Sequence, residues 1–224
     1  MDKQELLKLG AKELGVELTN DMIDKLFIYM HFLKEYNKKV NLTSIIEDTD
    51  IIIKHFLDSI SILQYIDIKK EQKIIDIGTG AGFPGVVLKI VADNLQLTLV
   101  DSTRKKITFL EELFTKISIS EITCIHARAE ELCKHRLHNA KYDYCVSRAV
   151  SRLAKLSEYC LPYIKPGGLF LAMKGRNYNN ELKDAMSIIK QLGCELEETK
   201  EIPLPFSSSG KGEIVHAIVK IRKI

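Results

Sequence analysis

The chain is predicted to be an α/β protein built on a doubly wound, mostly parallel sheet of seven strands. From Glu71 onward, short apolar runs alternate with segments of helical period, which is typical of parallel strands joined by helices. The last two apolar runs have no helical segment between them, so we expect them to pair as a terminal antiparallel hairpin. A helical region precedes this alternation. We therefore predict a helical subdomain over residues 1–66 and a sheet domain over residues 67–224.

Composition excludes several classes of protein. With 46% hydrophobic and 28% charged residues among 224, the chain has the balance of an ordinary globular protein with a substantial core. No apolar run approaches the roughly 20 residues that span a bilayer, and the N-terminus mixes acids and bases, unlike a signal peptide. The five cysteines form no C-x-x-C pair, which favours reduced thiols. We expect a cytoplasmic protein with no membrane partner. His135 and His138 have no nearby ligand partners, so we expect no metal.

The first 66 residues show helical periodicity. A short helix is predicted over 4–14, because Gly15 stops it, and a second is predicted to open at Thr19 or Asn20 with an apolar stripe behind it. Asp48 can cap a third helix that runs to about Tyr65. A polar loop separates the second and third helices.

The sheet domain is read from its apolar runs and the turns between them. Lys165-Pro-Gly-Gly, for example, marks the turn before the fifth strand. The predicted strands are 73–77, 96–100, 122–126, 143–147, 168–173, around 195–202, and 214–221. The predicted helices are 84–92, 103–117, 129–135, 150–161 and 179–192.

A glycine-rich turn follows the first predicted strand and is the most informative motif. Gly78, Gly80 and Gly82 let the backbone turn sharply and come close to a ligand, at a point where a helix N-terminus offers N–H groups. Asp76 ends the strand that enters this turn. The motif is not a P-loop, because valines follow Gly85 where Lys and Ser or Thr are required. A purely structural strand-to-helix turn is the alternative.

Acidic residues follow the next two strands as well. Asp101 stands 101 − 76 = 25 positions after Asp76, near the roughly 20 expected for a carboxylate that binds ribose. Glu130 and Glu131 follow the third strand. Since the carboxyl ends of parallel strands share one edge of a sheet, this pattern predicts a nucleotide-like cofactor along that edge.

The absence of other motifs narrows the reaction. The Tyr-Lys pair four apart that many nicotinamide dehydrogenases use occurs only at Tyr65 and Lys69, before the first strand. Seven strands with a terminal hairpin fit an S-adenosylmethionine-dependent methyltransferase better. The Asn-Pro-Pro motif of amine methylation and the Pro-Cys of pyrimidine C5 methylation are both missing. What remains is an acceptor that is nucleophilic enough to need no catalytic base.

Several blocks, taken together, resemble the ribosomal RNA small-subunit methyltransferase G family, also called glucose-inhibited division protein B. The resemblance covers nearly the whole chain. One departure is Lys54, where the family often has Arg, and residues 207–212 match only loosely. The blocks are Asn37-Lys-Lys-Val-Asn-Leu-Thr, His55-Phe-Leu-Asp-Ser, Asp76-Ile-Gly-Thr-Gly-Ala-Gly-Phe-Pro-Gly, Leu99-Val-Asp-Ser, Arg128-Ala-Glu, Ser147-Arg-Ala-Val, Lys165-Pro-Gly-Gly and Met173-Lys-Gly.

The resemblance implies a Rossmann-like class I fold and methylation of N7 of a guanine in the 530 loop (position 527) of bacterial 16S rRNA. S-adenosylmethionine would be the methyl donor, with 16S rRNA or the small-subunit particle as partner, and we expect a monomer. Guanine N7 carries a lone pair and no proton, so direct in-line displacement without a general base is expected. A non-catalytic S-adenosylmethionine-binding assembly factor and a small-molecule methyltransferase are the alternatives.

The resemblance also implies roles for individual residues. Asp101 is expected at the ribose hydroxyls, and Ala129 with Glu130 beside the adenine; dipole complementation is the alternative for Glu130. Phe83 and Arg148 have packing and ion-pair alternatives, and Asn41 and His55 have helix-capping and core alternatives. The predicted cofactor residues are Asp76, Gly78, Gly80, Gly82, Phe83, Asp101, Ala129, Glu130 and Arg148. The predicted positioning residues are Arg148, Asn41 and His55. Position, rather than the resemblance, predicts the RNA contacts, because they fall in predicted loops or helix starts at the sheet edge where the chemistry would occur: Lys38, Lys39, Arg104, Lys105, Lys174 and Arg176.

Overall fold

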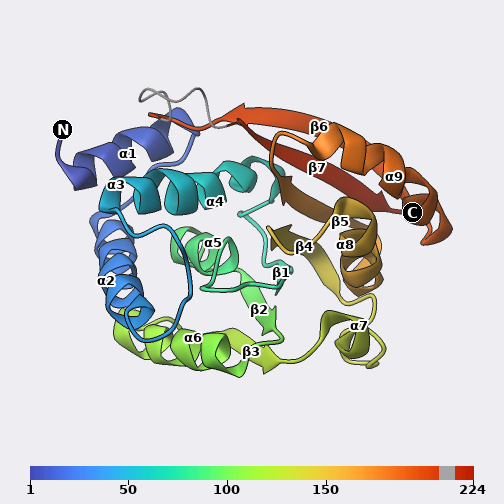
Figure 1. Ribbon diagram of the computed structural model, residues 1–224, viewed down its shortest axis with the longest axis horizontal. Coiled ribbons are helices and arrows are strands. Elements are labelled where there is room, and N and C mark those ends of the chain that lie inside the picture. Colours follow the sequence, from blue (N-terminus) through green and yellow to red (C-terminus); the bar gives the residue numbers. More distant parts are fainter. Residues whose placement is uncertain (207–214) are drawn as a thin grey trace.

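The computed structural model describes residues 1–206 and 215–224, and its centre is one seven-stranded sheet (Figure 1). The strand order is β3-β2-β1-β4-β5-β7-β6. Neighbouring strands from β3 to β5 are parallel, whereas β7 pairs antiparallel with both β5 and β6. The strands are β1 (Lys73–Ile77), β2 (Gln96–Asp101), β3 (Ile122–His126), β4 (Tyr142–Arg148), β5 (Ile164–Lys174), β6 (Cys194–Pro203) and β7 (Val215–Lys223).

The N-terminal region is helical, as predicted. The helix α1 covers Lys3–Glu13, and α2 covers Asn20–Asn37 with the Thr19 hydroxyl accepting a bond from the Met22 amide at its start. A longer helical segment, residues 48–65, changes its winding along its length. It consists of α3 (Asp48–Ile51), a π-helical stretch (Ile52–Leu57), α4 (Asp58–Ile60) and a 3₁₀ turn (Ser61–Tyr65).

The remaining helices connect the strands of the sheet. They are α5 (Gly85–Val91), α6 (Arg104–Ile117), α7 (Ala129–Leu132), α8 (Leu153–Cys160), a 3₁₀ turn (Leu161–Tyr163) and α9 (Tyr178–Gln191). In Figure 1, α5 and α6 lie on the side of the sheet that faces the N-terminal helices, and α8 lies on the other side. None of the helices in the described parts of the chain has the length and apolar content that crossing a membrane requires.

Alternating side chains of each strand supply two hydrophobic cores, one on either face of the sheet. Ile74 and Val146 belong to the core that includes α1, α2, α5 and α6, while Ile75 and Cys145 belong to the core with α8 and α9. This alternation is the period-two signature of a strand covered on both faces. The N-terminal helices therefore share one core with a face of the sheet. Where the chain divides into domains stays a prediction.

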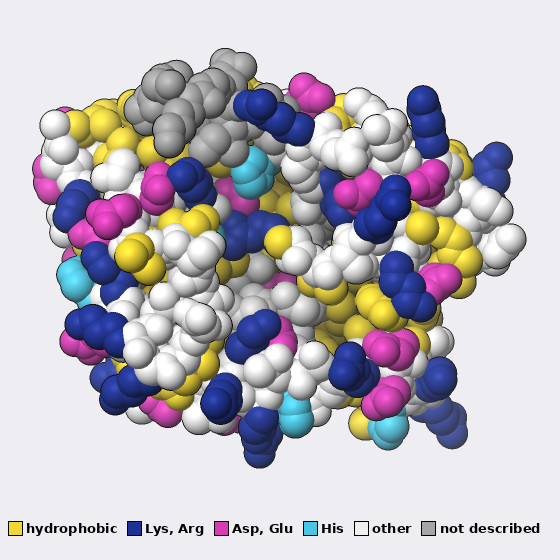
Figure 2. Space-filling model, in the orientation of Figure 1, with side chains coloured by type: hydrophobic (Ala, Val, Ile, Leu, Met, Phe, Trp, Pro, Cys, Tyr) yellow, Lys and Arg dark blue, Asp and Glu magenta, His cyan; other side chains and the backbone are white. Residues whose placement is uncertain are grey.

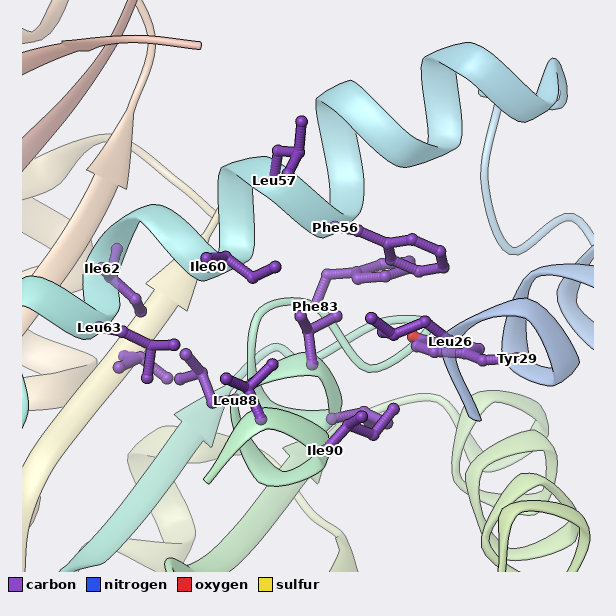
Figure 3. Close-up of a cluster of buried hydrophobic side chains, with 14 of the residues drawn as sticks. Leu26, Tyr29, Phe56, Leu57, Ile60, Ile62, Leu63, Phe83, Leu88 and Ile90 are labelled. Atoms are coloured by element: carbon purple, nitrogen blue, oxygen red, sulfur yellow. The ribbon is translucent and has the colours of Figure 1, made fainter. Parts of the chain in front are cut away.

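Aromatic side chains join the N-terminal helices to the glycine-rich turn. Tyr29 of α2, Phe56 of the π-helical stretch and Phe83 of the turn lie together in the first core (Figure 3). The Tyr29 and Phe83 rings stack with 5.1 Å between centroids. This packing holds residues 48–65 close above the carboxyl edge of the sheet.

The predicted strands, helices and antiparallel hairpin are confirmed, with local differences at element ends. The turn predicted at Lys165-Pro-Gly-Gly is not found: these residues lie within β5, where its pairing with β4 shifts register. Asp48 is the first residue of α3 and makes no cap bond; the residue before the helix is Glu47. The Asp48 carboxylate instead accepts hydrogen bonds from Lys3 and Lys34, which hold the pKa of Asp48 below its usual value. The strand start predicted at residue 214 and the loosely matching stretch 207–212 lie outside the described residues.

Candidate functional site

The glycine-rich turn is braced from inside by hydrogen bonds to its own amides. Gly78 and Gly80 adopt left-handed φ values of 70° and 61°, which suit glycine. The Gly78 amide donates to the Val100 carbonyl at 2.9 Å, and the Gly80 amide donates to Asp101 Oδ2 at 3.0 Å. The turn is thereby tied to the end of β2, so it presents a preformed backbone to any ligand.

Asp76 supports this turn from its buried side by hydrogen bonds. Its Oδ2 accepts bonds from the Thr79 hydroxyl at 2.8 Å and from the Gly85 amide at 2.9 Å. The side chain is fully buried, and burial raises the pKa of Asp76 to about 6. We predicted Asp76 as a cofactor contact and a free helix N-terminus beside it, but the carboxyl has no exposed surface and occupies the first amide of α5. Its effect on a ligand is therefore exerted through the shape of the turn.

Of the three glycines in the turn, Gly80 is the one that opens on empty space. A Cβ atom built on Gly80 would have no heavy atom closer than 3.9 Å. On Gly78 it would lie 2.3 Å from Val150 Cγ2, and on Gly82 it would lie 2.8 Å from the Tyr29 hydroxyl. Gly82 therefore allows close packing of the turn against α2, whereas Gly80 leaves room on the outer side of the turn.

That room is part of a cavity of about 210 Å³ at the carboxyl edge of the sheet. The predicted residues Gly78, Gly80, Phe83, His55 and Arg148 meet here. Figure 2 shows that this face of the molecule is hollowed near its centre, with Lys and Arg side chains around the hollow. The cavity is lined by Leu42, Thr43, His55, Gly78, Thr79, Gly80, Ala81, Phe83, Lys106, Arg148 and Ala149.

Arg148, the last residue of β4, is held by three hydrogen bonds to the helical segment 48–65. Its Nη1 donates to the Lys54 carbonyl at 2.8 Å and to Asp58 Oδ2 at 2.7 Å. Its Nη2 lies 2.9 Å from Nδ1 of His55. The guanidinium also lies over the Phe83 ring, 5.1 Å from the centroid. Arg148 therefore has a single, fully supported position in the cavity wall.

His55 is a neutral ring whose two nitrogens are both engaged. Because a guanidinium only donates, Nδ1 of His55 accepts from Arg148, and the ring proton lies on Nε2, 3.0 Å from the Thr43 hydroxyl. Burial, followed by the positive charge of Arg148, lowers the pKa of His55 to about 3. The ring also stacks on Phe83 at 4.3 Å between centroids. His55 thus has no free lone pair with which to remove a proton.

A second, larger cavity of about 650 Å³ adjoins the first. The two share His55, Arg148 and Ala149 as walls. Ala149 has a left-handed φ of 56°, a conformation that favours glycine, immediately after the arginine. The residues that line only the larger cavity are Ile45, Lys54, Met173, Lys174, Gly175, Arg176, Asn177, Glu181 and His216.

Asp58 and His216 are site residues that the sequence analysis did not single out. Asp58 is fully buried, and its second oxygen, Oδ1, lies 2.7 Å from Nδ1 of His216 on β7. One carboxylate therefore contacts two residues of the larger cavity: Oδ2 accepts a hydrogen bond from Arg148, and Oδ1 lies close to His216 without a hydrogen bond. The available signal was an acidic residue placed among the inward-facing apolar positions of residues 48–65, within the block that begins at His55.

Other predicted residues lie outside the walls of both cavities. Asn41 is exposed, while the neighbouring Leu42 and Thr43 line the smaller cavity because both their amides donate to the side chain of Asn37. Glu130 is exposed near the start of α7. The carbonyl of Ala129 accepts a bond from the Tyr163 hydroxyl. Roles for Asn41, Ala129 and Glu130 stay predictions.

Asp101 lies at the end of β2, directly beside Gly80. Its Oδ2 accepts from the Gly80 amide and lies 3.3 Å from Nζ of Lys106, and its Oδ1 accepts from the Thr103 amide. The residue is only 4% exposed. Oδ1 has one donor in the described structure and can accept a second bond, so a contact between Asp101 and a ligand hydroxyl stays a prediction.

The six cations predicted to contact RNA differ in position. Lys38, Lys39, Arg104, Lys105 and Arg176 are exposed. Lys174 is buried: it lies 2.6 Å from Glu181 and donates to the Ser151 carbonyl. An ammonium engaged in this way holds α9 and the loop after β4 together. Lys174 therefore forms a structural ion pair with Glu181 rather than an exposed surface charge, and we remove it from the predicted phosphate contacts.

A further cavity, of about 430 Å³, lies at the opposite edge of the sheet. Its walls include Lys73, Gln96 and Ile122, which are the first residues of β1, β2 and β3. The glycine-rich turn is at the other end of these strands. In open α/β sheets ligands bind outside the carboxyl ends of the strands, so the pair of cavities beside the turn is the candidate site.

Comparison with known proteins gives a consistent family. Residues 22–205 match the family model described as rRNA small subunit methyltransferase G. The chain is 47% identical over 224 residues to the ribosomal RNA small subunit methyltransferase G of Alkaliphilus oremlandii, covering 100% of this chain and 92% of that protein. It is 43% identical to the protein of the same name from Clostridium novyi, covering 98% and 88%.

Solved structures resemble the chain in fold. The structure of M. jannaschii TYW2 in complex with AdoMet matches with a TM-score of 0.54 and 12% identity, over 69% of this chain and 70% of that one. A putative sarcosine dimethylglycine methyltransferase from Galdieria sulphuraria matches with a TM-score of 0.51 and 13% identity, over 70% and 80%. The predicted fold class, a Rossmann-like class I methyltransferase sheet, is confirmed.

Proposed function

This chain belongs to the rRNA small subunit methyltransferase G family, and we propose that it transfers a methyl group from S-adenosylmethionine to N7 of a guanine in the 530 loop of 16S rRNA. Relatives named for rRNA methylation support RNA as the substrate. One observation carries the N7 assignment: two cavities meet at His55, Arg148 and Ala149, and the one titratable ring at that junction is neutral with its lone pair in use. The junction suits an acceptor that has no proton to lose.

The residues of the smaller cavity fit S-adenosylmethionine. A side chain on Gly80 would project into the cavity, so glycine there leaves room for a ligand against the backbone. Asp101 stands beside Gly80 with one oxygen able to accept a further bond, which suits a ribose hydroxyl. We propose that the turn and Asp101 hold the adenosine part of the cofactor, with Phe83 and Arg148 at the other end of the cavity.

S-adenosylmethionine, when bound, would supply a methyl group on a cationic sulfur: the N7 lone pair would form the new N–C bond as the S–C bond breaks, leaving a neutral thioether and a positive charge on the purine. The positive charge is thus moved, and no proton is removed in the step. The chain must therefore align donor and acceptor, and alignment alone can lower a barrier by up to roughly 7–11 kcal/mol.

Arg148 is well suited to the junction because Asp58 balances its charge. An unpaired guanidinium would repel a cationic sulfur and a purine that is becoming positive. The 2.7 Å contact with the buried Asp58 carboxylate compensates that charge while leaving the guanidinium as a rigid wall. We propose that Arg148 positions the reacting groups and that His55, stacked on Phe83, helps to hold it in place.

Exposed cations near the carboxyl edge supply the phosphate contacts in this proposal. Lys38 and Lys39 follow α2, Arg104 and Lys105 open α6, and Arg176 lines the larger cavity. Phosphate contacts orient an RNA without reading its sequence, and an unpaired loop allows a single base to enter a pocket.

Mapping of methylated nucleotides tests the proposal. We expect 16S rRNA from cells that lack the protein to lose one N7-methylguanosine in the 530 loop, and purified protein with S-adenosylmethionine to restore it on small-subunit particles or on their RNA. Saturable cofactor binding without any methyl incorporation would instead identify a binding factor. Turnover in the absence of RNA would identify a small-molecule methyltransferase.

A further inference from the structure

We propose that the Glu181 carboxylate reads the Watson–Crick edge of the target guanine, the edge formed by its N1–H and N2 amine donors, within the larger cavity; this assignment rests on the proposed function. The cavity volume, about 650 Å³, lies within the range of ligand pockets and exceeds that of the adjoining smaller cavity. Its apolar walls include Ile45 and Met173, which suit the faces of a base. A base that is read outside a duplex is held by stacking and by hydrogen bonds to its edges.

The position of N7 sets the orientation of the guanine. N7 must point toward the junction of the two cavities, where Arg148 stands. O6 lies on the same edge of the base as N7. Arg148 uses three of its five N–H groups in bonds to the helical segment 48–65, so it can also donate to O6. The N1–H and N2 amine groups then point away from the junction, toward walls that belong to the larger cavity alone.

Glu181 stands on one of those walls, near the start of α9, and only one of its two carboxylate oxygens is in use. Oε2 lies 2.6 Å from Nζ of Lys174 and accepts from the Leu153 amide at 2.8 Å. These contacts fasten the side chain to the end of β5 and to the first residue of α8. Within residues 1–206 and 215–224, Oε1 receives no hydrogen bond, yet it is not a fully buried atom. The side chain is only 16% exposed, so Oε1 is an open acceptor on a shielded and fixed group.

A carboxylate oxygen suits this edge of guanine because the edge presents two donors side by side. A carboxylate accepts with each lone pair and cannot donate, so Oε1 can receive both N1–H and the N2 amine. Two other side chains on these walls are less suited. The side-chain oxygen of Asn177 already accepts from Asn180, and each nitrogen of His216 can donate or accept according to its protonation. Adenine has an acceptor at N1 and no amine at C2, so the same carboxylate repels it.

The open oxygen of Glu181 also favours the reaction itself. Methyl transfer makes the purine positive, so N1–H and the N2 amine become stronger donors as the transition state forms. Hydrogen bonds that strengthen in the transition state lower the barrier, whereas bonds of constant strength only tighten binding. Loss of this acceptor should therefore lower kcat with guanosine more than it raises KM.

Glu181→Gln tests the reading role while the structural bonds are kept. Lys174 and the Leu153 amide are both donors, so the amide oxygen of the glutamine takes the place of Oε2 and its NH₂ group turns to the cavity. A donor then faces the donors of guanine. Lys174→Gln is the complementary change, because it removes the ion pair and leaves the open carboxylate oxygen in place. Asp184→Asn removes an exposed acid from the same helix and is the matched control.

The substrates are small subunits reconstituted with 16S rRNA that carries either guanosine or inosine at the target position. Inosine lacks the N2 amine and keeps N1–H, O6 and N7. For the wild-type protein and Asp184→Asn, we expect kcat/KM to be about tenfold or more lower with inosine, because the acceptor loses one of its donors. Glu181→Gln should lose this preference, mainly through a lower kcat with guanosine. Lys174→Gln should keep it.

S-adenosylmethionine affinity, measured by calorimetry, should be unchanged in Glu181→Gln, because Glu181 lines only the larger cavity. The same measurement reports that the variant is folded. If the single variant does not fold, Glu181→Gln/Lys174→Met removes the buried lysine charge together with that of the acid. This double variant should show the same loss of preference for guanosine.

Three results would overturn the assignment. Equal preferences in Glu181→Gln and Lys174→Gln would mean that Glu181 acts only through its ion pair. Loss of the preference in His216→Phe, with Glu181→Gln retaining it, would give the reading role to His216. Equal rates with guanosine and inosine in the wild-type protein would mean that the N2 amine is not read. If the wild-type protein methylates neither substrate, the proposed function fails, and this assignment fails with it.

Discussion

The Arg148 guanidinium and the Asp58 carboxylate, 90 positions apart in the sequence, meet at 2.7 Å beneath the candidate site. Asp58 is fully buried, and the Arg148 side chain is 14% exposed. Two charges at this depth are tolerable only because each compensates the other. The pair fastens the helical segment 48–65 to the end of β4, so the roof of the cavity and its floor are joined at the point where donor and acceptor would meet.

Substituting Asp58→Asn should therefore impair both stability and activity. The side chain keeps its size but loses its charge, which leaves the Arg148 guanidinium nearly buried without a counter-charge. We expect the free energy of unfolding to fall by about 3 kcal/mol, measured by urea denaturation, and methyl transfer to fall more than tenfold. The matched control is Asp184→Asn, which removes the exposed ion pair with Arg152 and should cost less than about 1 kcal/mol. Equal effects of the two substitutions would contradict this view of the site.

Gly80→Val should abolish cofactor binding while the protein stays folded. The new side chain would enter the smaller cavity, because no heavy atom lies closer than 3.9 Å to a Cβ at this position. A valine at this position would also have to adopt the left-handed φ of 61°, which costs roughly 1–2 kcal/mol of strain. Gly15→Val is the control: Gly15 has a φ of 80° and open space around it, so it carries similar strain away from the cavity. Calorimetry with S-adenosylmethionine should show binding in the control alone. Wild-type affinity in Gly80→Val would remove the turn from the site.

The sequence predicted the elements of this fold because each depends on local pattern. Alternating apolar runs determine the strands, and left-handed φ values at Gly78 and Gly80 are a property of the motif itself. The contacts made by Asp58 could not be predicted in this way. They depend on residues 48–65 lying across the end of β4 and on β7 bringing His216 to the same place. Such contacts arise from packing between distant elements, which no local period encodes.

The same reasoning explains the predicted residues whose positions differ from expectation. A strand-end carboxylate such as Asp76 can face a ligand or support the turn. Its hydrogen bonds from Thr79 and Gly85 show that it supports the turn. A lysine at the end of β5 can face solvent or pair with an acid on the next helix. Lys174 does the second, because it forms an ion pair with Glu181. In both cases the residue type was consistent with either role, and only the three-dimensional neighbours separate them.

The pH–rate profile should show no rise between about pH 6 and 9 that is caused by deprotonation of His55. Its Nδ1 accepts from Arg148, and its pKa is lowered to about 3, so the ring does not change protonation in that range. N7 of guanine needs no deprotonation either. We expect His55→Asn to lower kcat without changing the shape of the pH–rate profile. A limb with an apparent pKa near 6.5 that disappeared in His55→Asn would make His55 a general base.

The same lowered pKa makes His55 a source of acid instability. In the unfolded chain the ring protonates below about pH 6.5, whereas in the folded protein it does so only near pH 3. The stability contributed by neutral His55 is therefore complete above pH 6.5 and is lost as the pH falls toward 3, at up to about 1.4 kcal/mol per pH unit. Asp76, with its pKa raised from 3.8 to about 6, acts with the opposite sign between those values.

Comparison of two proteins isolates the His55 contribution. Because the Asp76 carboxyl and the other acids are common to both, the difference in unfolding free energy between His55→Asn and wild type should move in favour of the variant as the pH is lowered from 6.5 to 4. Urea denaturation at several pH values measures it. A difference that stays constant over this range would mean that His55 is protonated in the folded protein.

RNA binding should depend on Arg104 and Lys105 but not in the same way on Lys106, the next cation in the sequence. Arg104 and Lys105 are exposed at the start of α6, whereas Lys106 lies 3.3 Å from Asp101 and lines the smaller cavity. We therefore expect the double substitution Arg104→Gln/Lys105→Gln to weaken RNA binding and leave S-adenosylmethionine affinity unchanged. If each cation contacts a phosphate, the log–log slope of affinity against salt should fall by about 0.7–0.9 per contact.

The control for this last prediction carries the same loss of charge elsewhere. Lys8→Gln/Lys12→Gln removes two exposed cations from α1, so it changes the net charge equally without touching the carboxyl edge of the sheet. Its salt slope should match that of wild type. Adding Lys106→Gln to the double variant should, by contrast, weaken cofactor binding, because Asp101 loses a neighbouring cation. If the two double variants bound RNA equally well, the charges at the start of α6 would be a solvated helix end and the RNA path would have to follow the cations after α2.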